Sequence, residues 1–326
     1  MNESRAVCFS LVIPVFNVAE YVGVCLATIR NQTYPRWECV CVDDGSSDGS
    51  GRVLDDYASA DARIRVIHQP NCGVSVARRN GFRETEGDYC WFVDGDDILH
   101  PVALEVLAEA SRVCPHKLFS FPCSVLHNEA ERRSFLARDV AHGFECVLAS
   151  AYGRLQRQTL PLSVYHRSLI RDDDFGEYRV AEDLLAAQKI LARTDGIAVL
   201  SASLYGYVMR QDSVSHQWSE RKLLDSLVGH AALLSFFGEN RWCVNKRFWD
   251  ADWKWVAFGI PCVAKDVGAG RTLHEMWRRV LIQTMPIGFI WRVYGVMLRC
   301  ILRCPSVASS VWKVNAMVGA RYWGKK

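Results

Sequence analysis

The sequence has no CxxC pair, although it contains thirteen cysteines, an odd number scattered from Cys8 to Cys304. Cysteines inside apolar runs, such as Cys39 and Cys41, behave as small hydrophobic core residues. This spacing argues against a disulfide framework and predicts a reducing compartment. The opening residues, MNESRAVCFS, also lack the basic and then apolar layout of a signal peptide. We therefore expect a cytoplasmic protein.

The chain also lacks an internal repeat and an uninterrupted apolar run long enough to cross a membrane. The most apolar candidate, residues 280–298, is interrupted by Gln283, Pro286 and Arg292, whereas a spanning helix needs about 20 predominantly apolar residues. Half of the 326 residues are hydrophobic and 23% are charged, a balance typical of a packed globular protein. This composition excludes disorder as the main state, and the length allows two ordinary domains.

Acidic residues are nearly absent from the end of the chain. Residues 267–326 contain ten Lys or Arg and one acidic residue, Glu275, while the first 266 residues contain 29 basic and 35 acidic residues. The formal net charge of +3 therefore combines an acidic body with a strongly basic tail. No nucleic-acid-binding motif accompanies this charge, so we do not expect nucleic acid as a partner.

Three arginines of the tail fall on one narrow stripe if the segment is helical. Arg292, Arg299 and Arg303 are separated by seven and then four residues, which places them within about 40° of one another around a helix. A broad apolar surface that includes Trp291 and Tyr294 accompanies them. This pattern predicts a helix lying in the interface of an anionic membrane. The alternative is a helix packed on the rest of the protein with its arginines in water.

Short apolar runs alternate with amphipathic stretches over the first 125 residues. The pattern predicts strands at 9–15, 37–42, 64–68 and 89–93. Between and after them it predicts helices that begin near Asn17, around Ser47 or Asp48, at Ser75 and at Pro101. Such alternation is typical of a mostly parallel sheet flanked by helices, so the predicted fold class is α/β.

The pattern loosens beyond residue 125. The polar stretch at 127–139 predicts a loop or a short hairpin, and a further helix is expected near 144–152. Residues 182–191 carry apolar side chains in helical register, and 197–208 are expected to be extended. A long helix is expected at 219–237. Residues 217–326 are therefore predicted to form a helical C-terminal region.

Acidic residues cluster where the fourth predicted strand ends, in YCWFVDGDD. On an extended chain Asp94 and Asp96 would point to the same side, and Gly95 between them would let a ligand approach the backbone. Two such carboxylates suit Mg²⁺ or Mn²⁺, whose other positions go to water and phosphate oxygens. The alternative is a capped turn in which the aspartates accept hydrogen bonds from backbone NH groups.

Two further motifs lie at predicted element ends, where ligands of open α/β sheets collect. In VDDGSSDGS, Asp43 or Asp44 can accept hydrogen bonds from an imide or a ribose. The plainer interpretation is a strand–turn–helix cap. GVSVARRNG places Arg78 and Arg79 early in a helix, where guanidinium groups and NH dipoles suit a diphosphate. Arginines on helix surfaces are also common without such a role.

In this order, the motifs SLVIPVFNVAEYV, VDDGSSDGS, GVSVARRNG, FVDGDD and AEDLL closely resemble those of the family 2 glycosyltransferases of the GT-A fold. The resemblance covers residues 9–101 and returns at 182–216. It implies a catalytic domain over residues 1–216, with a donor-binding half at about 1–125 and an acceptor half at 126–216. It also implies inverting transfer of a sugar from a nucleotide sugar, with UDP as the expected nucleotide. The expected acceptor is a glycan or a lipid-linked molecule of cell-surface polysaccharide or glycolipid synthesis.

The resemblance matches nine positions to donor binding, namely Pro14, Phe16, Asp43, Asp44, Arg78, Asp94, Gly95, Asp96 and Arg210. The first four would line the nucleobase pocket. In the DxD motif the last carboxylate, Asp96, would hold the metal on the diphosphate and the first, Asp94, would face the ribose. The chain departs from the family at Phe16, where a tyrosine is usual, and at Arg79, where an asparagine is usual.

Asp183 matches the catalytic base of the family, which takes the proton of the acceptor hydroxyl during inverting transfer. The plainer role of Glu182 and Asp183 is to complement a helix dipole. Tyr205, Tyr207, Arg210, Ser213 and His216 resemble a stretch that follows the base in many relatives, so Arg210 or His216 is expected to reach the diphosphate or the metal. The plainer interpretation of His216 is a solvated histidine in a polar loop. The implied cofactor is Mn²⁺ or Mg²⁺, with Asp94, Asp96 and His216 as its candidate ligands.

Two alternatives remain open at this point. FVDGDDIL superficially fits the nucleophile loop of phosphatases of the haloacid dehalogenase type, although that function would not use the other motifs. A binding protein that keeps the fold without catalysis is the second alternative, because a fold does not fix a function. The expected location of the enzyme is the cytoplasm, attached peripherally to the inner face of the membrane through the tail.

Overall fold

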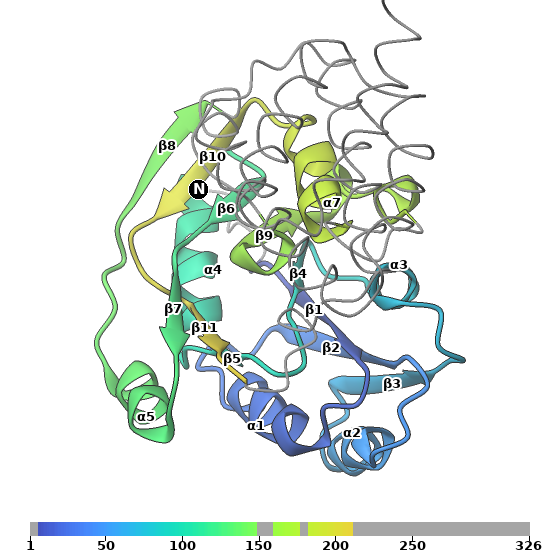
Figure 1. The fold of residues 1–326 in the computed structure, drawn as a ribbon. Helices are drawn as coiled ribbons and strands as arrows, with labels where there is room; N and C mark the ends of the chain where they lie inside the picture. Colours follow the sequence, from blue (N-terminus) through green and yellow to red (C-terminus); the bar gives the residue numbers. More distant parts are fainter. Residues whose placement is uncertain (1–5, 149–158, 177–181, 211–326) are drawn as a thin grey trace, which may run out of the picture. The chain divides into compact units, whose positions relative to one another are not determined.

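The computed structural model describes residues 6–148, 159–176 and 182–210, which are coloured in Figure 1. All of them belong to the first of two units into which the chain divides, residues 1–177 together with 182–211. The expected helix at 219–237, the basic tail, Ser213 and His216 lie outside the described residues. The domain boundary at residue 216 stays a prediction.

An eight-stranded, mostly parallel sheet forms the centre of this unit and confirms the predicted fold class. The strand order is β3-β2-β1-β4-β9-β6-β10-β8. β1 is parallel to β2 and β4, and β2 is parallel to β3, whereas β9 runs antiparallel between β4 and β6. In chain order the strands are β1 Phe9–Val15, β2 Trp37–Asp43, β3 Ile64–His68, β4 Tyr89–Phe92, β6 Leu118–Ser120, β8 Phe144–Leu148, β9 Ser163–His166 and β10 Gly196–Leu200.

Three short strands form a second sheet in the order β5-β11-β7. β5 is Ile98–Leu99, β7 is Cys123–Leu126 and β11 is Tyr205–Val208. β10 and β11 together confirm the extended chain that we predicted at 197–208. Only residues 93–97 separate β4 from β5, so this sheet connects the end of β4 to the segment that leads to Arg210.

Helices cover both faces of the large sheet (Figure 1). The α-helices are α1 Ala19–Arg30, α2 Ser50–Ala60, α3 Val74–Arg83, α4 Ala103–Val113, α5 Glu129–Ala137 and α7 Glu182–Leu191, and the 3₁₀ helices are η1 Leu160–Leu162, η2 Arg167–Leu169 and η3 Asp172–Asp174. The helix expected to be capped around Ser47 or Asp48 begins at Ser50, whose NH donates to Asp48. Among the described residues, none of the helices has the length and apolarity to cross a membrane.

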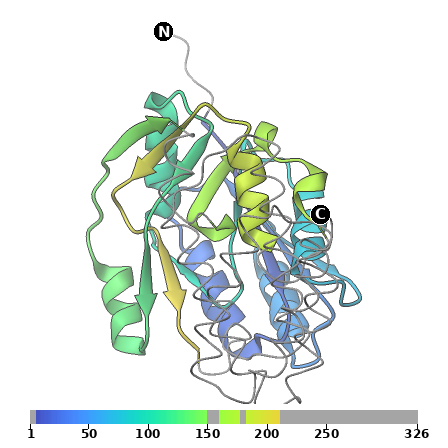
Figure 2. The same ribbon diagram turned by 45° about the horizontal axis from the view of Figure 1, so that its top comes forward.

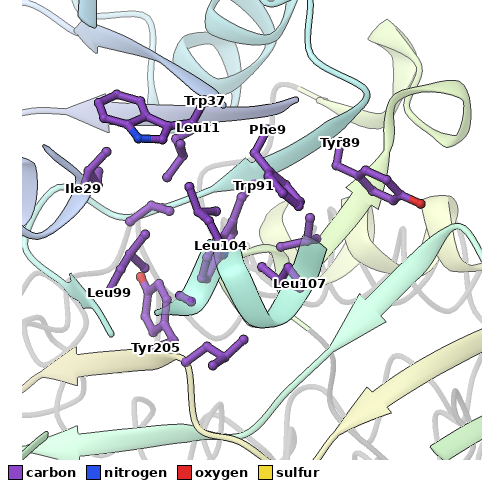
Figure 3. Close-up of a cluster of buried hydrophobic side chains, with 14 of the residues drawn as sticks. Phe9, Leu11, Ile29, Trp37, Tyr89, Trp91, Leu99, Leu104, Leu107 and Tyr205 are labelled. Carbon is purple, nitrogen blue, oxygen red and sulfur yellow. The ribbon is translucent and has the colours of Figure 1, made fainter. Parts of the chain in front are cut away.

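The alternation of side chains along β1 explains the two covered faces. Leu11 and Ile13 point into the main core, which Figure 3 shows around Leu104 and Leu107 of α4 and Trp91 of β4. All five side chains are fully buried. The apolar run FSLVIPV therefore forms a strand that is buried on both faces, as expected inside a parallel sheet.

The opposite face of the sheet carries α3, which packs on Val40 and Val42 through Ala77. Gly81 lets this helix approach closely, because a Cβ there would come within 2.6 Å of Val12 Cγ1. This close packing holds Arg78, on the same helix, next to the end of β4.

The polar stretch at 127–139 contains α5, so the predicted loop or hairpin is wrong. Asn128 caps α5 by accepting a hydrogen bond from the NH of Glu131, and the Glu131 carboxylate accepts one from the NH of His127. These contacts satisfy NH groups at the start of the helix.

The helix predicted near 144–152 is also wrong, because residues 144–148 form β8. Phe144 to Leu148 pair antiparallel with Leu200 to Gly196 of β10. This pairing at the sheet edge decides the conformation, and the partner strand lies some fifty residues further along the chain.

A buried ion pair anchors α7, the helix that begins with Glu182 and Asp183. The ribbon of this helix is yellow-green in Figure 2. Arg193, just beyond the helix, donates to Asp174 Oδ2 at 2.7 Å and to Asp174 Oδ1 at 2.5 Å. Asp174 is only 1% exposed. A third bond, from Arg193 to the carbonyl of Leu169, ties the helix to the segment after β9.

Candidate active site

Several of the side chains predicted from the motifs lie where the parallel strands β1, β2 and β4 end. Pro14 is buried inside β1, in register with Val42 of β2. Phe16 follows β1 and is 48% exposed. An exposed aromatic ring beside strand ends has the accessibility needed to stack on a base.

Asp43 ends β2 and is bonded within its own turn. Its Oδ1 accepts a hydrogen bond from the NH of Ser46 at 2.9 Å, and its Oδ2 lies 3.0 Å from Nδ1 of His68. Burial opposes ionisation, but the bonds from Ser46 and His68 outweigh it and lower the pKa of Asp43. Gly45 enables the turn, because its φ of +77° is unfavourable for other residues.

Asp44 organises the loop between β3 and α3. Its Oδ1 accepts hydrogen bonds from Gln69 Nε2 and from the NH of Cys72, and its Oδ2 accepts one from the NH of Gly73. The carboxylate is 3% exposed. Both aspartates of the motif therefore act as turn caps in this structure, and their contact with a nucleobase stays a prediction.

Arg78 joins the end of β4 to the start of α7. Its Nη2 lies 2.9 Å from Asp94 Oδ1 and its Nη1 lies 3.3 Å from Glu182 Oε1. The side chain is 4% exposed. Burial opposes the charge, but Asp94, Glu182 and Asp183 together raise the pKa of Arg78, which stays protonated. The guanidinium is thus a fixed positive charge in the centre of an acidic cluster.

The DGDD segment is a turn, so the extended geometry that we predicted for Asp94 and Asp96 is wrong. β4 ends at Phe92, and the NH of Asp97 donates to the carbonyl of Asp94 at 3.1 Å. Gly95 is buried in this turn, where a Cβ would lie 3.2 Å from Val15 Cγ2. The two carboxylates consequently reach different arginines.

Arg210 is the arginine that reaches Asp96. Its Nη2 lies 2.6 Å from Asp96 Oδ2, and its guanidinium carbon lies 5.0 Å from the centre of the Tyr21 ring. The side chain is 10% exposed. The structure therefore brings Arg210, predicted at the diphosphate, next to the predicted metal ligand.

Asp97 was not among the predicted site residues, although it completes the acidic run. It is 1% exposed, and it accepts hydrogen bonds from the Tyr205 hydroxyl at 2.5 Å and from the NH of Val208 at 2.8 Å. Burial, followed by the charges of Asp96 and Asp94, raises the pKa of Asp97. Through these bonds Asp97 holds the DGDD turn against β11, the strand that carries Tyr207 and precedes Arg210.

Glu182 and Asp183 form the first turn of α7. Asp183 Oδ1 accepts a hydrogen bond from the NH of Leu184 at 2.7 Å. Burial first, and then the neighbouring Asp183 carboxylate, raise the pKa of Glu182 to about 7. The sequence had indicated Asp183 alone, and the role of Glu182 as a partner of Arg78 becomes visible only in the folded chain.

A Glu182→Gln variant should lose a pH dependence of stability that the wild type has. Because the folded-state pKa of about 7 exceeds the usual 4.5, ionisation is penalised in the folded state, and stability falls as the pH rises through this range. The difference in unfolding free energy between wild type and variant should change by about 3 kcal/mol between pH 4.5 and 8. Urea denaturation at several pH values measures it.

Glu20→Gln is the matched control, since Glu20 is an exposed acid in the first turn of α1. Its stability should follow the wild-type pH profile. Parallel profiles for Glu182→Gln and wild type would contradict the raised pKa.

The carboxylates of the DGDD turn fit a hard divalent cation by their donor chemistry. Asp94 and Asp96 present oxygen ligands on side chains that are 34% and 22% exposed. Within the part of the chain that the structure describes, no group of three or more His, Cys, Asp or Glu is arranged to hold a metal ion. A cation bound at Asp94 or Asp96 would therefore take most of its ligands from phosphate and water, which is usual for Mg²⁺.

Comparison with known proteins shows which family the chain resembles. The family model described as glycosyl transferase family 2 matches residues 10–170. The glycosyltransferase GlyA of Streptococcus pneumoniae is 28% identical over 248 residues, which are 70% of this chain and 35% of GlyA. The chain thus spans about a third of the length of that relative.

Solved structures share the fold at low sequence identity. TarS of S. aureus, residues 1–349 in complex with UDP-GlcNAc, aligns over 90% of this chain and 80% of its own with a TM-score of 0.57 and 18% identity. The mannosyltransferase PcManGT of Pyrobaculum calidifontis, in complex with GDP-Man and Mn²⁺, aligns over 99% and 89% with a TM-score of 0.50 and 15% identity. These likenesses confirm the predicted fold.

Proposed function

Because the chain belongs to glycosyl transferase family 2, we propose that it transfers a sugar from a nucleotide-sugar donor to a hydroxyl group with inversion at the anomeric carbon. The observation that carries the proposal is the position of Arg78, which is bonded both to Asp94 of the DGDD turn and to Glu182 of α7. A donor site at strand ends and a base on the adjacent helix are the two parts that such a transfer requires.

The donor is a nucleoside diphosphate sugar, with UDP as the proposed nucleotide. Phe16, Asp43 and Asp44 surround the ends of β1 and β2, where the base would bind. The diphosphate would lie beside Asp94 and Asp96, next to Arg78 and Arg210. TarS was solved with UDP-GlcNAc and PcManGT with GDP-Man, which supports a nucleotide-sugar donor for this fold.

Asp183 is the proposed general base. Its carboxylate takes the proton of the acceptor hydroxyl as that oxygen attacks the anomeric carbon, from the face opposite the leaving diphosphate. Arg78 and Arg210 stabilise the negative charge that develops on the diphosphate, in a partly buried setting where such charges act strongly. A divalent cation held by Asp94 and Asp96 would add Lewis-acid stabilisation of the same leaving group.

The proposed acceptor is a glycan or a lipid-linked molecule, and the proposed process is polysaccharide or glycolipid assembly at the inner face of the membrane. The basic tail supports this location by its charge pattern alone, because it lies outside the described residues. Neither the phosphatase nor the inactive binding protein is favoured, since the family match extends over all the N-terminal motifs.

Changing Arg292, Arg299 and Arg303 together to glutamine should weaken binding to anionic vesicles by about 100-fold, since each basic residue near such a surface contributes about 1 kcal/mol. Sedimentation with phosphatidylglycerol vesicles measures this, and phosphatidylcholine vesicles are the control. Equal sedimentation of the variant and the wild type would contradict membrane attachment through the arginine stripe.

Nucleotide release tests the proposed activity. The purified full-length protein is incubated with UDP-, GDP- and dTDP-sugars, Mn²⁺ or Mg²⁺ and a membrane lipid extract, and the free nucleotide is quantified. We expect release from one class of donor that depends on the extract, and NMR of the product should show an inverted anomeric configuration. The proposal is wrong if no donor is bound or consumed and simple phosphate esters are hydrolysed instead.

A further inference from the structure

His68 lies between two carboxylates at the edge of the proposed donor site. It ends β3, in register with Asp43 at the end of β2. Nδ1 is 3.0 Å from Asp43 Oδ2, and Nε2 is 3.0 Å from Asp55 Oδ1 of α2. Asp43 is 7% exposed, whereas the side chains of His68 and Asp55 are 51% and 59% exposed. The imidazole therefore links a buried carboxylate at the site to an exposed one on the neighbouring helix.

Contacts on both oxygens fix the orientation of the Asp43 carboxylate. Its Oδ1 is engaged by the NH of Ser46, and the first turn of α2 closes on Oδ2. Gly51 permits this approach, because a Cβ there would lie 2.7 Å from Asp43 Oδ2 and 3.4 Å from His68 Cε1. Both carboxylate oxygens are thus oriented by short contacts, one of which comes from His68.

We propose that His68 is a positioning residue for donor recognition, which orients the Asp43 carboxylate toward the nucleobase by bridging it to Asp55. This inference rests on the proposed function, because it specifies how the proposed nucleobase pocket is held in shape. The ligand group concerned is an N–H donor on the edge of a base, such as the imide of uracil. A correctly oriented carboxylate can accept a hydrogen bond from this group.

The bridge depends on the protonation of the imidazole. Only the imidazolium donates from both nitrogens, whereas the neutral ring donates from one and turns a lone pair toward the other carboxylate. Within the described residues, the charged groups that contact this ring are Asp43 of β2 and Asp55 of α2, and the turn of α2 that packs on it presents uncharged Gly51. The hydrogen bonds to Asp43 and then to Asp55 raise the pKa of His68 above its usual 6.5. Donor affinity should therefore decline as the pH rises through that raised value.

Isothermal titration of UDP, with Mg²⁺ present, tests the proposal between pH 6 and 9. In His68→Gln the dissociation constant should be about three- to tenfold higher than in the wild type at pH 6.5, which is the effect of one hydrogen bond. The ratio of the two constants should approach one near pH 9. Taking this ratio at each pH cancels the titration of the diphosphate itself.

Asp55→Asn provides a second variant that leaves Asp43 and His68 in place. Its loss of affinity should set in at lower pH than in the wild type, because one of the two carboxylates that favour the imidazolium is gone. His142→Gln is the matched control, since His142 forms a comparable exposed pair with Glu109 at 2.6 Å. It should reproduce the wild-type curve.

Failure of this inference can be told apart from failure of the proposed function. If the wild type binds UDP and His68→Gln binds it equally at every pH, the positioning role is overturned while the proposed function stands. If the wild type binds neither UDP nor GDP, the proposed donor site itself is wrong. Circular dichroism of His68→Gln establishes that the variant is folded, and Asp55→Asn tests the bridge independently.

Discussion

The Asp183→Asn variant is expected to lose about 10²–10⁴-fold in kcat, the usual contribution of a general base. An asparagine amide has nearly the same shape as the carboxylate but cannot take a proton from the acceptor hydroxyl. The KM for the donor should stay close to the wild-type value, because Asp183 lies on α7 and the donor contacts that we propose lie on other segments. Initial rates of nucleotide release at saturating acceptor measure kcat.

Two variants make this result specific to Asp183. Asp195→Asn changes an exposed acid beyond the other end of α7 and should keep the wild-type kcat. Glu182→Gln should lose less activity than Asp183→Asn. In the proposed reaction Glu182 is bonded to Arg78 and does not take the proton of the acceptor hydroxyl. If Asp183→Asn keeps more than a tenth of the wild-type kcat, or if Glu182→Gln is the more damaged variant, Asp183 is not the base.

The first part of the fold could be predicted because local patterns determine it. The strand expected at 9–15 is β1, Phe9–Val15, and its seven residues are all buried. A continuous apolar run of this length between turn residues has few other stable conformations. The helix expected at 182–191 is α7, Glu182–Leu191. Its sequence, EDLLAAQKIL, consists mostly of strong helix formers, so local propensity also favours this element.

The segment after residue 125 could be predicted less well, for two different reasons. α5 has a local signal in Asn128 followed by Glu131, but the polar composition of the stretch had suggested a loop. β8 has no comparable local signal, because it is an edge strand whose conformation depends on pairing with β10. Interactions between distant segments of this kind override local propensity.

The candidate site could also be predicted only in part from local sequence patterns. The acidic motifs indicated Asp94, Asp96 and Asp183, yet the partner of Arg78 on α7 is 104 residues away in the sequence. The turn at Asp94–Asp97, fixed by Tyr205 and Val208 through Asp97, also depends on residues more than 100 positions later. Motifs identified the residue types, whereas the pairing of charges required the folded chain.

The Arg78→Met variant is expected to be both inactive and markedly less stable at pH 8. Arg78 is 4% exposed and contacts Glu182, which is 13% exposed, and Asp94, which is 34% exposed, so its removal leaves these carboxylates without their buried counterion. Breaking a buried pair in this way costs about 3–5 kcal/mol. The loss should be smaller at pH 5. Without the arginine the folded-state pKa values of these carboxylates rise, and stability is then lost as the pH increases through them. Urea denaturation of the variant and the wild type at pH 5 and pH 8 measures the loss of unfolding free energy at each pH.

Two further arginine variants separate charge from geometry. Arg78→Lys keeps the positive charge but loses the planar fork that reaches two carboxylates at once, so it should recover much of the stability and little of the turnover. Arg79→Met, at the next position of α3, should leave the pH dependence of unfolding as in the wild type, because Arg79 does not bridge the acidic cluster within the described residues.

Two outcomes would contradict these roles of Arg78. If Arg78→Met lost the same unfolding free energy relative to the wild type at pH 8 as at pH 5, the guanidinium would not be the counterion of the cluster. If Arg78→Lys restored full turnover, a point charge would be sufficient. The simultaneous contact with the Asp94 turn and α7 would then have no catalytic role.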